Sequence, residues 1–138
     1  MKVLLIDDTP EIAELLTFGL RDHGFDVVSS GFTAGINDLI AAERPDALVF
    51  DCSVLEMSES LLDTVRGDEA HAALPIVMIS DRPEQADARL AARDAKRVLL
   101  IPKPFAASHV ARALNQLLSN PHPSPNPNPN PQSPIPNP

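Results

Sequence analysis

The fold follows from one stretch near the N-terminus, KVLLIDDTPEIAELLTFGL at residues 2–20. An apolar run of strand length at 2–6 passes through two aspartates into a segment of helical period. Thr9 is a plausible N-cap and Pro10 suits a first helical turn. The apolar stripe of this helix is predicted to comprise Ile12, Leu15, Leu16 and Gly19.

The same succession of strand and helix repeats along the chain. Further strands are predicted at 25–29, 46–50, 75–79 and 98–101, and further helices at 33–43, about 58–67, 84–94 and 106–118. The strands are mostly apolar on both faces, which is typical of a parallel sheet covered by helices on both sides. The pattern therefore predicts an α/β fold with five parallel strands and right-handed crossovers.

Length and composition restrict the class of protein. A chain of 138 residues suits one domain, and its formal net charge of -8 argues against a nucleic-acid surface. The single cysteine, Cys52, cannot form an internal disulfide. The N-terminal apolar run is too short for a signal peptide or a membrane span, so we expect a cytoplasmic protein.

The apolar pattern ends near Ser119, and residues 119–138 hold nine of the 15 prolines and no formal charge. Proline at nearly alternate positions disfavours helix and sheet, so we expect a domain over 1–118 and a disordered Pro/Asn-rich tail over 119–138. A neutral extension is favoured over a recruiting arm, because the tail offers a partner no charge or aromatic anchor.

Polar residues collect where the predicted strands end: Asp7, Asp8, Asp51, Ser80 and Lys103. The carboxyl ends of parallel strands share one edge of a sheet, which is where ligands bind in such folds. Three carboxylates gathered there repel one another, each pair by about 4 kcal/mol at an effective dielectric near 20. A cation must balance them, and oxygen ligands of this kind suit Mg²⁺.

The lysine stands in LIPKPF at 100–105, between Pro102 and Pro104. Proline fixes its own backbone angle, so Lys103 is held at a strand end with little conformational freedom left to lose. Such a lysine is well placed to serve the acidic cluster.

With these motifs the sequence resembles the receiver domain of bacterial response regulators over residues 1 to about 118. The resemblance rests on Asp7-Asp8, on Asp51 in VFDCS, on Ser80 in VMISD and on Lys103 in PKPF. It implies a flavodoxin-like, doubly wound sheet of strand order 2-1-3-4-5.

The resemblance also implies a chemistry. Asp51 would accept a phosphoryl group from a sensor histidine kinase or a histidine phosphotransfer protein. Asp8, Asp51 and the backbone carbonyl of Ser53 would hold Mg²⁺, with Asp7 acting directly or through water. A carboxylate is a workable nucleophile for phosphorus once metal and lysine balance the incoming charge.

Two further residues complete the implied site. Ser80 would hydrogen-bond the phosphoryl group and Lys103 would pair with it. The family resemblance also implies a cis peptide bond between Lys103 and Pro104. Pro102 is less usual there, but is tolerable if the fifth strand lies at the edge of the sheet.

Four positions depart from the family pattern. Leu55 and Glu59 stand where the loop after Asp51 usually carries proline and glycine, so the turn there is expected to differ in shape. Leu100 replaces an aromatic residue that, in the family, normally couples to the hydroxyl at the position of Ser80. Asp81 adds a negative charge beside Ser80, unless it is a solvent-facing helix cap.

These observations predict a single-domain response regulator that catalyses only its own phosphorylation and dephosphorylation and signals by protein contact. The candidate contact face comprises the fourth helix, the fifth strand and the fifth helix, in a monomer or a phosphorylation-dependent homodimer. The alternative is a degenerate receiver that binds partners constitutively. A haloacid-dehalogenase-type phosphatase is disfavoured, because Cys52 and Ser53 follow Asp51 where such enzymes need a second aspartate.

Other reactive residues receive structural interpretations. Cys52 should point to the sheet face opposite Asp51 and act as a small core residue. No histidine has metal-ligand spacing, so none is assigned to catalysis: His23, His71, His109 and His122. A locally basic segment is interpreted as a solvated face rather than a docking surface for an acidic partner: Arg82, Arg89, Arg93, Lys96 and Arg97.

Overall fold

The computed structural model describes residues 1–119 and contains one five-stranded parallel sheet of order β2-β1-β3-β4-β5. The strands are β1 (Lys2–Asp7), β2 (Asp26–Ser30), β3 (Ala47–Asp51), β4 (Ile76–Ser80) and β5 (Val98–Pro102). The predicted fold class and strand order are confirmed. Pro102 lies at the end of an edge strand, in register with Ser80 of β4.

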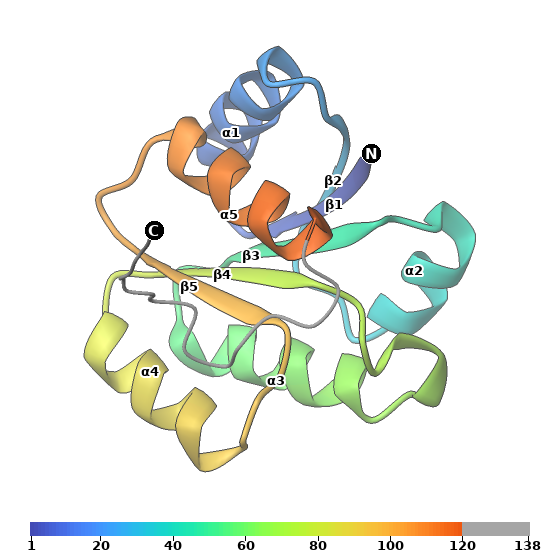
Figure 1. The fold of residues 1–138 in the computed structure, drawn as a ribbon, viewed down its shortest axis with the longest axis vertical. Helices are drawn as coiled ribbons and strands as arrows, with labels where there is room; N and C mark the ends of the chain where they lie inside the picture. Colours follow the sequence, from blue (N-terminus) through green and yellow to red (C-terminus); the bar gives the residue numbers. More distant parts are fainter. Residues whose placement is uncertain (120–138) are drawn as a thin grey trace, which may run out of the picture.

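Helices cover both faces of this sheet (Figure 1). They are α1 (Pro10–Asp22), α2 (Ile36–Glu43), α3 (Leu55–Arg66), α4 (Pro83–Ala92) and α5 (Ala107–Ser119), with a short 3-10 helix, η1, at Glu69–His71. Helices α1 and α5 lie on one face, and α2, α3 and α4 lie on the other. The loops that leave the carboxyl ends of β1, β3, β4 and β5 therefore meet at one edge.

Two apolar clusters, one on each face, hold the sheet between its helices. Alternate residues of β1 divide between them: Val3 and Leu5 face α1 and α5, whereas Leu4 and Ile6 face α2 and α3. All four are fully buried, as expected for central parallel strands. Cys52 belongs to the second cluster, which confirms its interpretation as a core residue.

The predicted stripe of α1 is correct for Leu16, which is buried, and for Gly19, which lies against Ala107 of α5, but wrong for Ile12 and Leu15. Leu15 is 71% exposed and Ile12 38% exposed, whereas Leu16 and Leu20 are buried against the sheet. The helix has apolar residues on more than one side, so periodicity alone did not fix the buried side. Thr9 is the N-cap by position, but its side chain makes no capping hydrogen bond.

Element ends differ from the predictions by a few residues. Helix α3 begins at Leu55 rather than near 58, and Ser119 belongs to α5 rather than to a tail. The predicted tail otherwise lies outside the described residues. Between residues 1 and 119, no helix is both long and apolar enough to cross a bilayer.

Candidate functional site

Asp7 and Asp51 lie side by side at the centre of the site. They end the neighbouring strands β1 and β3 and are partners in the parallel register. Both are buried, with 4% and 2% of their surfaces exposed. Asp7 Oδ1 accepts a hydrogen bond of 2.8 Å from the backbone N–H of Thr9, whereas its Oδ2 has no hydrogen-bond partner.

This crowding has an electrostatic consequence. Burial, followed by the neighbouring charges of Asp51 and Asp8, raises the pKa of Asp7 from 3.8 to about 7. The direction agrees with the repulsion expected among three carboxylates gathered at this edge. The site thus favours a cation or a proton among its carboxylates.

Lys103 provides one such cation. Its Nζ lies 3.1 Å from Asp51 Oδ1, and apart from this ion pair both Asp51 oxygens lack a hydrogen-bond partner. The peptide bond between Lys103 and Pro104 is cis, as the family resemblance implied. The backbone N–H of Lys103 donates to the Ser80 carbonyl at 2.8 Å, which ties the lysine loop to β4.

Asp8 and Ser53 contact each other across the mouth of the site. The Ser53 backbone N–H donates to Asp8 Oδ1 at 2.9 Å, and the Ser53 hydroxyl makes a short hydrogen bond to Asp8 Oδ2. These hydrogen bonds help lower the pKa of Asp8, against the opposing effect of burial. The loop after β3 is therefore held against the loop after β1.

Ser80 is buried at the end of β4, and its hydroxyl accepts a hydrogen bond of 3.0 Å from the backbone N–H of Arg82. Its own proton remains available for donation. Arg82 occupies the N-cap position of α4. Asp81 is exposed and precedes it, so the helix-cap interpretation of Asp81 is wrong, although its solvent exposure is confirmed.

The donor set fits Mg²⁺ in its chemistry. Buried carboxylate oxygens of Asp7 and Asp51 have no hydrogen-bond partner. Hard oxygen ligands of this kind are those that Mg²⁺ prefers. In the described part of the chain, however, no three acidic, thiol or imidazole groups are grouped closely enough to hold a metal ion. Asp8, turned toward Ser53, would have to reorient to join a metal-binding set.

Glu59 is the residue whose role the sequence did not reveal. It is buried on α3, where its carboxylate pairs with Arg89 and with Arg93 Nη1, the latter at 2.9 Å. Its counterions lie 30 or more residues further along the chain, so no local pattern indicated the contact. Arg89 and Arg93 are exposed, as expected for a solvated basic face, but they also pair with acidic groups of α3.

The other departures have modest structural effects. Leu55 is the first residue of α3, so the helix starts directly after the loop that leaves β3. Leu100 is partly buried and packs against the cluster shared by α2 and α3.

Burial raises the pKa of the Cys52 thiol to about 11, which keeps it protonated near neutral pH.

Comparison with known families agrees with this geometry. Residues 3–115 match the model of the response regulator receiver domain. The chain is 32% identical over 123 residues to the response regulator MprA of Mycobacterium avium, covering 86% of this chain and 51% of the relative. It is 30% identical over 103 residues to the transcriptional regulatory protein KdpE of Mycobacterium tuberculosis, covering 75% and 44%.

Solved structures show the same fold. A sensor protein from Polaromonas sp. JS666 aligns with a TM-score of 0.76 at 23% identity, covering 87% of this chain and 97% of that one. The receiver domain of the sensor histidine kinase PA1611 from Pseudomonas aeruginosa, solved with magnesium in its active-site cleft, aligns with a TM-score of 0.64 at 22% identity, covering 86% and 98%.

The chain belongs to the response regulator receiver domain family of two-component signalling systems. It spans about half the length of the curated relatives that it matches.

Proposed function

We propose that this receiver domain accepts a phosphoryl group on Asp51 in a Mg²⁺-dependent reaction and signals through protein contact. The donor is a sensor histidine kinase or a histidine phosphotransfer protein. One observation carries the proposal: the Asp51 carboxylate is buried, short of hydrogen-bond donors, and 3.1 Å from the ammonium group of Lys103. Such a group is a nucleophile whose charge is balanced from one side only.

In the proposed reaction, an Asp51 oxygen attacks phosphorus as the bond from phosphorus to the donor histidine nitrogen breaks. The bonding electrons return to the imidazole, and Asp51 becomes an acyl phosphate. Lys103 balances the charge of the phosphoryl oxygens, and the Ser80 hydroxyl donates a hydrogen bond to one of them. Asp8, Asp51 and the Ser53 carbonyl would hold Mg²⁺, with Asp7 beside them, and the ion would supply positive charge that balances the charge of the transferring group.

The donor must reach the site from outside the sheet edge. A groove of about 950 Å³ borders Asp7 and Asp8 and runs down α1 past Leu15 and Phe18. Phe18 is 77% exposed, so the groove has an apolar wall open to a partner. This wall supports α1 as the docking element for the phosphoryl donor.

The rival function is a receiver that binds partners without switching. Leu100 favours it, because a leucine has no polar tip to exchange between solvent and a hydrogen bond. The presence of the residues Asp51, Ser80 and Lys103 argues against it, because a protein that only binds partners constitutively has no chemical need for them. We therefore expect switching, with a modest coupling of about five- to tenfold in partner affinity.

Beryllofluoride, a phosphoryl mimic, distinguishes the two functions. With Mg²⁺ present, it should shift the amide resonances of Ser80, Asp81, Arg82 and Lys103 in the wild type and leave those of Asp51→Asn unchanged. Absence of any shift in the wild type would favour the constitutive module. Equal shifts in both proteins would show that the mimic binds elsewhere.

A further inference from the structure

Helix α4 is attached to the domain with little apolar burial. Ala86 is its one fully buried residue, and Leu90 is partly buried. Helix α5, by contrast, buries five apolar residues: Val110, Ala111, Ala113, Leu114 and Leu117. Because apolar area removed from water is what chiefly holds a helix to a sheet, α4 needs other contacts to fix its position.

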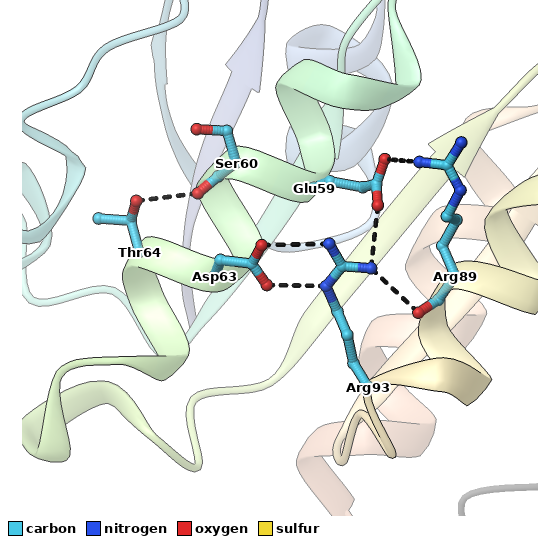
Figure 2. A network of polar contacts seen from close by, with 6 residues as sticks. All are labelled: Glu59, Ser60, Asp63, Thr64, Arg89 and Arg93. Atoms are coloured by element: carbon cyan, nitrogen blue, oxygen red, sulfur yellow. Dashed lines mark hydrogen bonds and ion pairs between the residues drawn. The ribbon is translucent and has the colours of Figure 1, made fainter.

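Those contacts are ion pairs with α3 (Figure 2). Glu59 pairs with Arg89 and with Arg93, while Arg93 forms a two-pronged contact with Asp63, with Nε–Oδ1 at 2.8 Å and Nη2–Oδ2 at 3.1 Å. Arg93 Nη1 also donates to the backbone carbonyl of Arg89 at 3.2 Å. The acidic pair stands four residues apart on α3, and the basic pair four residues apart along α4 and its C-cap, so each pair presents one helical face.

Burial makes the contact of Glu59 more than a surface ion pair. Its side chain is only 10% exposed, whereas those of Arg89 and Arg93 are 45% and 32% exposed. A carboxylate at that depth is costly without a counterion, and the two arginines reach in from the solvent side to supply it. The α4 position in which both arginines reach Glu59 is therefore favoured over displaced ones.

Both helices start at loops of the phosphorylation site. Helix α3 begins two residues after Ser53, which is bonded to Asp8. Helix α4 begins three residues after Ser80, whose hydroxyl is bonded to the backbone of Arg82. Any movement of the loop after β4 toward a phosphoryl group on Asp51 must therefore carry the start of α4.

We propose that Glu59, Asp63, Arg89 and Arg93 form a latch that holds α4 on α3 and opposes rearrangement of the loop after β4. The holding role follows from the contacts alone. The opposing role rests on the proposed phosphorylation of Asp51. A weakened latch would release α4 locally, without opening the sheet, and would favour the phosphoryl-bound arrangement.

Amide hydrogen exchange tests the holding role without phosphorylation. Glu59→Gln keeps the side-chain shape but removes the charge, and should speed exchange of the α4 amides by about tenfold while those of β1 and β3 stay unchanged. Glu43→Gln is the matched control, because it removes the ion pair between Glu43 and Lys2 on the far side of the domain. Unchanged exchange in α4, or an equal increase throughout the sheet, would overturn the latch.

The doubly substituted Arg89→Gln/Arg93→Gln variant provides a second reading, since it leaves the buried Glu59 without either arginine. Its α4 amides should exchange faster than those of Glu59→Gln. Slower exchange would contradict the idea that the arginines stabilise a buried charge.

Titration with beryllofluoride and Mg²⁺ then tests the opposing role. Glu59→Gln should bind the mimic about three- to tenfold more tightly than the wild type, because less free energy is needed to break the ion pairs of the latch. Equal affinities, with faster α4 exchange retained, would overturn the opposing role and keep the holding role. No binding by the wild type itself would refute the proposed phosphorylation, and with it the opposing role.

Discussion

Lys103 Nζ lies 3.1 Å from Asp51 Oδ1, although the lysine side chain is 31% exposed and that of Asp51 only 1% exposed. The ammonium group therefore reaches from the solvent edge toward a carboxylate that is almost wholly buried. A buried carboxylate depends strongly on such a partner, because losing it leaves an uncompensated charge.

Replacement of Lys103 by alanine should leave the domain folded but less stable. Without Mg²⁺, the free energy of unfolding in urea should fall by about 1–3 kcal/mol, since Asp51 loses its counterion. Mg²⁺ should stabilise this variant at least as much as the wild type, because one competing positive charge is gone. Complete loss of Mg²⁺ stabilisation in Lys103→Ala would instead make the lysine part of the metal site.

Mg²⁺ should stabilise the wild-type fold, because it relieves repulsion among Asp7, Asp8 and Asp51. At a concentration about ten times its Kd, a ligand of the native state adds about 1.4 kcal/mol to the free energy of unfolding. Differential scanning calorimetry with and without Mg²⁺ measures this gain as a rise in Tm.

Two variants at the mouth of the site distinguish its ligands. Asp8→Ala should lose most of the Mg²⁺-dependent rise in Tm, whereas Ser53→Ala should keep it, because Ser53 is expected to offer its backbone carbonyl. Ser53→Ala also removes the hydroxyl that now holds Asp8. A rise in Tm that survives Asp8→Ala would refute the assignment of Asp8 as a ligand.

The raised pKa of Asp7 predicts a pH dependence of stability in the metal-free protein. The folded state keeps a proton up to about 7, whereas the unfolded state loses it near 3.8. The unfolded state thus binds fewer protons in that window, so the free energy of unfolding should fall as pH rises from 3.8 to about 7 and then level off.

Asp7→Asn isolates this effect from the other titrating groups. Urea unfolding at several pH values should show a shallower decline for Asp7→Asn than for the wild type within the window. Parallel curves for the two proteins would mean that Asp7 titrates near its ordinary pKa.

Much of the fold could be predicted because its signals are local. Alternating strands and helices, apolar on matching faces, define a parallel sheet, and each strand was placed within a residue at its ends. The strand order came from family resemblance rather than from periodicity. The buried side of α1 escaped prediction, because Ile12, Leu15 and Phe18 are apolar yet exposed.

The site was predictable for a related reason. Asp7 and Asp51 end neighbouring strands, so topology alone brings them together, and the same holds for Ser80 and Lys103 at β4 and β5. The contact between Asp8 and Ser53 depends on loop conformation, which no period in the sequence specifies. The pairing of Glu59 with Arg89 depends on how two helices pack, and it was likewise missed.

Gly19 permits the close approach of α1 and α5. A Cβ added there would lie 2.4 Å from the Cβ of Ala107. Gly19→Ala should therefore destabilise the domain by about 1–3 kcal/mol, because overpacking outweighs the gain in helix propensity. Urea unfolding should show recovery in the double variant Gly19→Ala/Ala107→Gly, and a stabilising Gly19→Ala would contradict the contact.

Phosphorylation itself is the most direct test of the central claim. The protein should be incubated with acetyl phosphate and Mg²⁺ and its intact mass measured, with Asp51→Asn and an EDTA-treated sample alongside. The wild type should gain the mass of one phosphoryl group, and both controls should gain none. A wild type without the gain, or an equal gain in Asp51→Asn, would contradict the assignment of Asp51 as the phosphoacceptor.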